Sequence, residues 1–392
     1  MKHPVAVLGL PFDSLTSGEA VNAIERLIES GGTHQVATAN LDFWLNSHLN
    51  PHLHRILASC SLVLPDGMPL VWISKLFGAP LPERVTGVDL VPQLAQLSAR
   101  KGYRIFLLGG RPGVANRTAD VLERDHPGVR IVGTFSPLHE ELARMDHSEI
   151  LYRIRAAKPD ILLVAFGNPK QEKWIWMHRK RLGVPVTMGV GASFDILVGD
   201  MKRAPRWMQQ CGLEWLMRLA QEPARMAPRY LRDFFGLVKR LPLALFAAWT
   251  QAPDRGPSSM KTFTDLNGMH VYLHGKLTAE TVPVLQRAVD TAIARGLAVV
   301  AHLQTVSQID AEGLGFLMAA RRQLLDAGLA LSLAALDARL RFLLNAFCAE
   351  ALFEEWKSPR AHGLRVVEKE AAPYSNLGAR KAVLPMQMRS RG

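Results

Sequence analysis

Polar side chains follow two apolar segments of the sequence, at the point where each segment would end as a strand. Asp66 comes just after the apolar run Leu62–Leu64, and Thr38 and Asn40 end another such run. A carboxylate beside hydroxyl-binding Thr and Asn side chains is what a general base for an alcohol acceptor requires, a role worth about 10²–10⁴ in rate. Pro-Asp-Gly at 65–67 is also a common turn tripeptide, so a simple turn is the alternative.

Three strand-to-helix junctions carry glycine and polar residues in a pattern that suits an anionic ligand. In each, a glycine follows an apolar strand, so that backbone N–H groups or a helix N-terminus could face a diphosphate. Chain geometry at the glycines, and helix capping by Asn or Asp, are the alternatives. The candidate nucleotide-binding residues at these junctions are Gly109, Gly110, Gly167, Asn168, Lys170, Glu172 and Asp195.

The sequence predicts neither a metal nor a cofactor. It contains no Asp-x-Asp pair, and its three cysteines are too far apart in sequence to indicate a zinc site or a disulfide framework. A leaving diphosphate without a metal needs arginines, whose forked donors match phosphate oxygens. Arg218, Arg225 and Arg229 are available in the segment 214–230, where a solvated basic surface is the alternative.

Positive charge is concentrated in residues 201–250, which carry nine Lys or Arg against three acids in a chain of net charge +12. Such a segment attracts anionic lipid, nucleic acid or a phosphorylated ligand, and a solvated basic face is again the alternative. The apolar stretch Leu241–Trp249 is well short of the roughly 20 residues that span a bilayer. We therefore expect no membrane-spanning helix, and the cysteine usage favours a reducing cytoplasm.

Short apolar segments alternate with helical patterns over the first 250 residues, which is typical of a parallel sheet covered by helices. The fold class is therefore predicted to be α/β. Predicted helices include Gly18–Ser30, Pro112–Arg124 and Pro169–Leu182. The predicted strands are Val5–Leu10, His34–Thr38, Leu62–Leu64, Tyr103–Leu108, Arg130–Gly133, Asp160–Ala165 and Val186–Met188.

The pattern restarts after a segment rich in Pro, Gly and Ser, which predicts two domains. We expect a first domain at 1–250, a linker at 251–260, a second, smaller α/β domain at 261–370 and a flexible tail at 371–392. In the second domain, strands are predicted at His270–His274, Val299–Leu303 and Ala330–Ala334. Helices are predicted near Ala279–Ala294, Glu312–Ala327 and Asp337–Ala346.

Seven motifs of the first domain, taken together and in order over nearly all of residues 1–235, resemble the bacterial WecG/TagA/CpsF family, glycosyltransferase family 26. The family has a Rossmann-like, mostly parallel sheet with helices on both faces. The matching segments are Thr38–Phe43, Pro65–Pro69, Arg84–Asp89, Phe106–Gly110, Phe166–Glu172, Gly189–Asp195 and Glu214–Tyr230.

This resemblance implies an inverting, metal-independent transfer from a UDP-sugar to a polyprenyl-diphosphate-linked saccharide in cell-surface or exopolysaccharide synthesis. The sugar would be N-acetylmannosamine, its uronic acid, or a hexose such as glucose. Asp66 matches the family's proposed catalytic base, and Arg218 and Arg225 match diphosphate-binding arginines. Arg229 is a looser match, because Pro228 stands where basic residues are common. The positions that match substrate-binding motifs are Thr38, Asn40, Arg84, Asp89 and Gln171.

The resemblance also implies that the basic appendage, at about 200–250, closes over the diphosphate and docks on the inner face of the cytoplasmic membrane. Its arginines and lysines are interleaved with Tyr230, Phe234, Phe235 and the stretch Leu241–Trp249, as in an interfacial anchor. A buried hairpin packed on the catalytic domain is the alternative. Lipid-linked acceptor and membrane surface are thus the expected partners, and nucleic acid is not.

The second domain resembles a STAS domain, the fold of anti-sigma factor antagonists. Val271–Thr278 is similar to its opening strand and turn, and Ile309–Leu317 is similar to the segment that normally reads Asp-Ser-x-Gly. Ala311 stands in place of the phosphorylatable Ser, and Gln304 replaces a common Asp. The resemblance therefore implies a protein partner or self-association rather than a phosphorylation switch.

Two other function classes compete with the transferase. A catalytically inactive, nucleotide-sugar-binding regulator could act through the STAS-like domain, although Thr38, Asn40, Asp66 and Gln171 are all present. A nicotinamide-dependent oxidoreductase is disfavoured, because the first domain lacks the G-x-G-x-x-G fingerprint at its glycine-bearing strand end.

Overall fold

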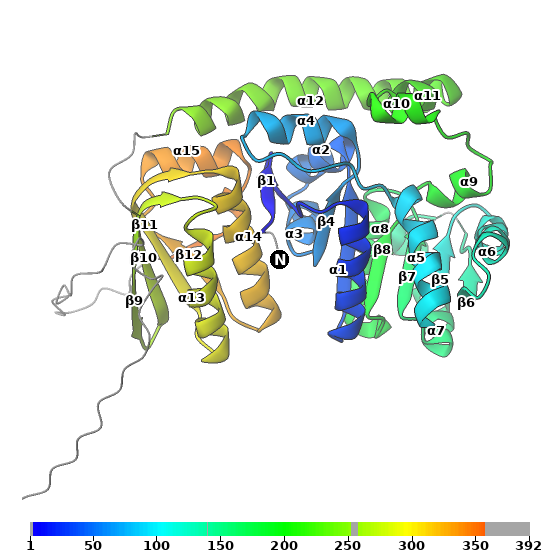
Figure 1. The fold of residues 1–392 in the computed structure, drawn as a ribbon, viewed down its shortest axis with the longest axis horizontal. Helices are drawn as coiled ribbons and strands as arrows, with labels where there is room; N and C mark the ends of the chain where they lie inside the picture. Colours follow the sequence, from blue (N-terminus) through cyan, green and yellow to red (C-terminus); the bar gives the residue numbers. More distant parts are fainter. Residues whose placement is uncertain (1–2, 139, 252–257, 357–392) are drawn as a thin grey trace, which may run out of the picture.

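The computed structural model of the protein describes residues 3–138, 140–251 and 258–356. These residues form a six-stranded sheet, a five-stranded sheet and a two-stranded hairpin (Figure 1). Most of the predicted linker and all of the predicted tail at 371–392 lie outside the described residues. The last two residues of the predicted linker belong to the first strand of the second sheet.

The first sheet is entirely parallel, in the order β4-β3-β8-β7-β5-β6. Its central strands are continuous apolar runs with both faces buried, as expected where helices cover a parallel sheet on both sides. The predicted α/β class is confirmed. The strands are β3 (His34–Ala39), β4 (Leu62–Pro65), β5 (Arg104–Gly109), β6 (Arg130–Phe135), β7 (Ile161–Ala165) and β8 (Val186–Gly189).

Helices cover both faces of this sheet, and each face has its own hydrophobic core. On one face lie α1 (Ser17–Glu29), α5 (Gly87–Lys101), α6 (Val114–Asp125) and α9 (Ser193–Leu197). The other face carries α2 (Leu41–Leu49), α3 (Pro51–Ala58), α4 (Met68–Leu76), η1 (Leu142–Arg144), α7 (His147–Ala157) and α8 (Lys170–Leu182).

The direction of the connections reverses between β5 and β7, which are neighbours in the sheet. From β5 the chain passes through α6 to β6 on one side, whereas from β7 it passes through α8 to β8 on the other. Ligands of open α/β sheets bind in the crevice at the carboxyl ends of the strands at such a point. Gly109, Gly110 and Gly167 flank this crevice.

The N-terminus does not form the first strand of the parallel sheet, so that expectation was wrong. Val5–Val7 (β1) and Leu10–Phe12 (β2) pair antiparallel as a separate hairpin. The chain reverses at Leu8 and Gly9, both of which have positive φ, 50° and 84°. Glycine adopts this conformation readily, and its presence inside the predicted strand Val5–Leu10 was the signal for a turn.

The second domain is a mixed five-stranded sheet in the order β13-β12-β11-β10-β9, with only the edge strand β9 antiparallel to its neighbour. The strands are β9 (Ser259–Asp265), β10 (Gly268–Leu277), β11 (Val299–Ile309), β12 (Leu331–Ala334) and β13 (Glu354–Glu355). The helices are α13 (Val282–Ala294), α14 (Ala311–Asp326), α15 (Ala338–Ala346) and η2 (Glu350–Leu352).

The basic appendage consists of α10 (Arg206–Gln210), α11 (Glu214–Gln221) and the 27-residue α12 (Pro223–Trp249). Figure 1 shows α12 lying across the top of both domains, over α2, α4 and α15. Leu241–Trp249 therefore continues one helix instead of forming the alternative buried hairpin. Among the described residues, no helix is both long and apolar enough to span a membrane.

The two domains share one hydrophobic core, in which the N-terminal hairpin packs against α14 and the end of α15. A Cβ at Gly315 would overlap the carbonyl oxygen of Pro4, and a Cβ at Gly9 would overlap that of Phe347. Arg322 of the second domain donates a hydrogen bond of 2.5 Å to the carbonyl oxygen of Cys60. The domain junction is thus a close-packed interface.

Candidate active site

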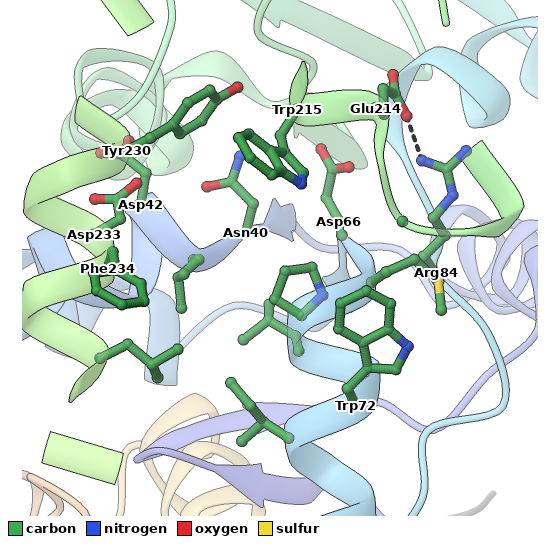
Figure 2. Close-up of a pocket in the computed structure, with 18 of the residues that line it drawn as sticks. Asn40, Asp42, Asp66, Trp72, Arg84, Glu214, Trp215, Tyr230, Asp233 and Phe234 are labelled. Atoms are coloured by element: carbon green, nitrogen blue, oxygen red, sulfur yellow. Dashed lines mark hydrogen bonds and ion pairs between the residues drawn. The ribbon is translucent and has the colours of Figure 1, made fainter. Parts of the chain in front are cut away.

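A cavity of about 540 Å³ lies between the carboxyl ends of β3 and β4, helix α4 and the appendage (Figure 2). Of the residues predicted from sequence, five line it: Asn40, Asp66, Arg84, Arg218 and Arg229. Tyr230 and Phe234, which were expected to contact the membrane, also line it. The lining residues that sequence reasoning did not single out are Leu41, Asp42, Gly67, Met68, Pro69, Leu70, Trp72, Ile73, Leu76, Gly212, Glu214, Trp215, Asp233 and Leu237.

Asp66 is held between the end of β4 and the start of α4. Its backbone N–H donates to the carbonyl oxygen of Ala39 at 2.9 Å, and Gly67, with a φ of 144°, turns the chain into α4. Figure 2 shows its carboxylate directed between Trp215 and Glu214. Within the described part of the chain, no protein group donates a hydrogen bond to this carboxylate, so its oxygens are available to a substrate.

The electrostatic surroundings of Asp66 suit a general base. Burial raises its pKa from 3.8 to about 6, and the negative charge of Glu214 adds to the rise, while Arg218 and Arg84 oppose it. A base is most effective when its pKa lies near the working pH, because it is then both ionised and able to hold a proton. At neutral pH Asp66 is ionised and more basic than an ordinary aspartate.

The carboxylate of Glu214 pairs with Arg84 of the first domain and with Arg218 of the appendage. Glu214, at the start of α11, lies 2.5 Å from the Nη1 of Arg84 and 3.8 Å from the Nη2 of Arg218. Arg84 also donates to Gln209 at 2.8 Å. Two guanidinium groups thus converge beside Asp66, at a distance where they could bind a diphosphate.

Asp42 ties α12 to the catalytic sheet. Its side chain is almost fully buried and accepts a hydrogen bond of 2.8 Å from Asn168. It also forms ion pairs with Arg229, at 3.3 Å, and with Arg232. Sequence reasoning missed Asp42, although it lies within the motif that contributed Asn40, which caps α2 by accepting from the N–H of Phe43.

Asp233 is a second buried carboxylate on this side of the cavity. Its pKa is raised from 3.8 to about 6, first by burial and then by the neighbouring charge of Asp42, against the opposing effect of Arg229 and Arg232. Asp42, Asp233 and the two arginines therefore form a charged cluster that holds the first half of α12 over the cavity.

Gln171 and Glu172 lie behind the strand-end loops and do not line the cavity. The Oε1 of Gln171 accepts from the N–H groups of Gly167, at 3.1 Å, and Gly191, at 3.0 Å. Its Nε2 donates to Glu172 at 2.8 Å, and burial raises the pKa of Glu172 to about 8. A Cβ at Gly189 would overlap the amide of Gln171. Gln171 therefore holds the backbone of the loops in place, and Glu172 holds Gln171.

Thr38 and Asp89 also lie outside the cavity. Thr38 is buried and its hydroxyl donates to the carbonyl oxygen of Gly189 at 3.4 Å. Asp89 accepts from the hydroxyl of Thr86 at 2.7 Å and pairs with Arg203 at 2.7 Å. These contacts position β3, β8 and the segment before α10.

The crevice between β5 and β7 carries its own charged groups. Beside Gly109 and Gly110, the exposed Arg111 pairs with Asp195 at 2.9 Å and with Asp200 at 2.8 Å. Sequence reasoning predicted Asp195 and both glycines here but missed Arg111, which directly follows the glycine pair. The crevice therefore offers a cation at the position where a nucleotide would be expected.

Two predicted nucleotide-binding cations point elsewhere. Arg225 is 63% exposed and forms an ion pair with Glu222 on the same helix turn. Lys170 donates to the backbone carbonyl of Glu140. Among the described residues, no group of three or more His, Cys, Asp or Glu is arranged to hold a metal ion.

Comparisons with known proteins agree with this geometry. The model described as "Glycosyl transferase WecG/TagA/CpsF family" matches residues 5–252, and the one described as "Mlab, STAS domain" matches residues 261–353. Three similar curated proteins are each named N-acetylglucosaminyldiphosphoundecaprenol N-acetyl-beta-D-mannosaminyltransferase.

The relative from Bacillus spizizenii is 36% identical over 190 residues, which are 48% of this chain and 72% of the relative. That from Bacillus subtilis is 34% identical over 170 residues, 43% of this chain and 64% of the relative. That from Staphylococcus aureus strain MW2 is 25% identical over 244 residues, 62% of this chain and 91% of the relative. Since the first model spans more than half of the chain, the protein belongs to the WecG/TagA/CpsF family of glycosyl transferases, with a STAS domain at its C-terminal side.

Proposed function

We propose that the protein transfers a sugar from a UDP-sugar to a polyprenyl-diphosphate-linked saccharide, with inversion and without a metal ion. The observation that carries the proposal is the carboxylate of Asp66, which accepts no hydrogen bond from the described residues, in one cavity with Arg84, Arg218 and Arg229. The names of the three relatives favour N-acetylmannosamine as the sugar and an N-acetylglucosaminyl diphosphate lipid as the acceptor.

The reaction is a single displacement. The carboxylate of Asp66 removes the proton from the acceptor hydroxyl, whose oxygen forms a bond to the anomeric carbon of the donor. The bond from that carbon to the diphosphate breaks, and its electron pair leaves with UDP. Arg84 and Arg218 stabilise the charge that develops on the leaving diphosphate, which is a preorganised electrostatic contribution. Asp66 then releases the proton to solvent.

Substrate binding requires the diphosphate to compete with Glu214. In the structure Glu214 pairs with both Arg84 and Arg218, so a bound diphosphate must displace its carboxylate. The exchange is favourable because diphosphate offers more acceptor oxygens in the geometry that arginine forks prefer. Loss of Glu214 from the pair also lets α11 move relative to the loop that carries Arg84.

The outer face of α12 supports docking on a membrane. Leu231, Phe235, Val238, Phe246 and Trp249 are each more than half exposed, and their spacing places them on one side of the helix. Basic residues at 232 and 239 flank this apolar face, as in helices that lie in the interface of an anionic bilayer. The proposed location is therefore the inner face of the cytoplasmic membrane.

The STAS domain is proposed to bind a protein partner or a second copy through the edge of its sheet that carries Phe263. The start of α14, where Ala311 replaces the phosphorylatable Ser, is already covered within the chain. Ala311 is buried, Gln251 at the end of α12 exchanges two hydrogen bonds of 2.6 Å with the backbone of Ile309, and β1 packs along the helix. Phe263, on the edge strand β9, is exposed.

The test is UDP release by the purified full chain, with chelator present, from UDP-N-acetylmannosamine and N-acetylglucosaminyl-diphosphoundecaprenol. Release that depends on the acceptor supports the proposal, and a panel of UDP-sugars then ranks the donors. Tight UDP binding without turnover on any lipid-linked acceptor would contradict the proposal and favour a regulatory, inactive domain. Activity that returns only with a divalent cation would overturn the metal-independent step.

A further inference from the structure

The cavity has two chemically distinct ends. Beside Asp66 the cavity is charged, with Arg84, Glu214 and Arg218. The other end is lined by apolar side chains: Met68, Pro69, Leu70, Trp72, Ile73, Leu76, Phe234 and Leu237. In Figure 2 the labelled polar residues lie above Trp72, which marks the apolar end.

Helices α4 and α12 supply the apolar part of the cavity. Helix α4 begins two residues after Asp66, so Trp72, Ile73 and Leu76 lie successively farther along it from the base, over about 12 Å in all. Helix α12 presents residues 230, 233, 234 and 237 to the same cavity, which is one helical face. On α12 the polar positions come first and the apolar ones follow, whereas every residue of α4 that lines the cavity is apolar.

The apolar end is open. Trp72 is 45% exposed, Leu76 49% and Phe234 57%. Phe234 lies at the edge between the cavity and the exposed apolar face of α12, where its ring contacts that of Phe235 edge-on at 5.7 Å. A ligand in the cavity could therefore leave through the apolar end and pass directly onto the surface proposed to meet the membrane.

We propose that this apolar groove between α4 and α12 binds the first isoprene units of the acceptor's polyprenyl chain. The proposal rests on the proposed function and names the part of the acceptor that this end of the site recognises. In that acceptor a diphosphate joins the sugar to the lipid. With the sugar hydroxyl at Asp66 and the arginines occupied by the donor's diphosphate, the acceptor's lipid must extend away from the base, and the groove supplies the matching apolar surface.

The nucleotide base of the donor is the main competitor for the groove. A uracil ring needs hydrogen-bond partners at its edge, whereas the groove is lined almost entirely by side chains that offer none. Gly109, Gly110 and Arg111 do not line the cavity, and they lie at the carboxyl end of β5, where nucleotides bind in open α/β sheets. The lipid is therefore the better match, and the base is an outcome of the test.

The test compares two soluble acceptors that share the N-acetylglucosaminyl diphosphate group, one carrying a farnesyl chain and one a methyl group, without membrane or detergent. For the full chain, we expect kcat/KM to be at least about tenfold higher with the farnesyl acceptor. The double variant Phe234→Ala/Leu76→Ala should lose this preference, so that its kcat/KM is the same with the two acceptors. Both residues are about half exposed, so folding should tolerate the change.

A matched control is Tyr152→Ala, which removes an exposed aromatic ring on α7, outside the cavity. It should keep the full chain-length preference. Calorimetric titration with farnesyl diphosphate and with inorganic pyrophosphate provides a readout that needs no turnover. We expect the farnesyl compound to bind at least about tenfold more tightly to the unmodified chain, and the double variant to bind the two alike.

The outcomes separate this inference from the function itself. Turnover that is indifferent to the lipid chain, with equal binding of the two diphosphates, would overturn the groove and leave the transferase intact. Absence of turnover with either acceptor, together with preferential farnesyl diphosphate binding, would support the groove and contradict the function. Weaker UDP binding in the double variant, with the chain-length preference kept, would assign the groove to the nucleotide base and overturn the inference.

Discussion

The raised pKa of Asp66 predicts a specific pH dependence of kcat/KM. With a pKa of about 6, the carboxylate is about 90% ionised at pH 7 and about 10% ionised at pH 5. Because only the ionised form accepts the proton of the acceptor hydroxyl, kcat/KM should fall about tenfold over that interval. An aspartate with its ordinary pKa of 3.8 would lose almost nothing between the same pH values.

The fall in kcat/KM toward low pH is the acid limb of its pH profile, and the substitution Glu214→Gln tests the physical cause of this limb. It removes a negative charge that raises the pKa of Asp66 and releases Arg84 and Arg218, whose positive charges lower it. A unit charge in a partly buried cavity is worth on the order of 1 kcal/mol, so the acid limb should move about 0.5–1 pH unit lower. UDP affinity should also rise, because the diphosphate no longer competes with a carboxylate.

The assay is initial UDP release at low acceptor concentration from pH 4.5 to 8.5. Glu222→Gln is the control, because Glu222 pairs with Arg225 on the surface of the appendage and should leave the limb in place. An acid limb near pH 4 in the unmodified chain would refute the assignment of a desolvated base. An unshifted limb in Glu214→Gln would refute the proposed role of its charge.

Three further predictions concern stability and membrane binding. Glu172 has a pKa of about 8 in the folded protein against an ordinary value of 4.5. Between these pH values the native state holds a proton that the unfolded state has lost, so stability falls as pH rises through this window. Glu172→Gln should therefore flatten the fall in Tm between pH 6 and 9. Gly315→Ala should cost several kcal/mol in urea unfolding, because its methyl group meets the backbone of β1, whereas Gly18→Ala, in open space on α1, should be neutral or slightly stabilising. Phe235→Ser/Trp249→Ser should weaken sedimentation with phosphatidylglycerol vesicles about tenfold or more without slowing turnover of a soluble acceptor.

Each of these has a contradicting result. Parallel Tm curves for Glu172→Gln and the unmodified chain would show that its carboxyl is ionised in the folded state. Equal stability of the two glycine variants would remove the close contact between α14 and the hairpin. Unchanged vesicle binding of the α12 variant would place the membrane contact elsewhere on the protein.

The α/β class was predictable because the strands of the first sheet are apolar runs bounded by strong local signals. The run Ile161–Ala165 is buried on both faces, and α1 begins with a capping box in which Thr16 and Glu19 satisfy each other's N–H groups. The N-terminal hairpin was missed because Val5–Leu10 reads as one apolar run. Only the left-handed backbone at Gly9, together with its packing against the second domain, distinguishes a turn there.

The site was only partly predictable. Sequence motifs indicated Asp66 and Arg84, which line the cavity. They could not reveal the pairing of Arg84 with Glu214, 130 residues later in the chain, since that contact exists only once α11 folds back onto the segment before α5. Gln171 and Glu172 were expected at the ligand because they are polar and follow a strand. Both are instead buried: Gln171 accepts hydrogen bonds from loop backbone and donates one to Glu172.

The most direct test of the account is acceptor-dependent UDP release by Asp66→Asn, measured beside UDP binding by the same preparation. The substitution keeps the size of the side chain and the backbone contacts of β4 but removes the base. We predict that turnover falls by about 10²–10⁴ while UDP binding stays within a fewfold of the unmodified chain. Near-normal turnover of Asp66→Asn would contradict the central claim that this carboxylate activates the acceptor hydroxyl.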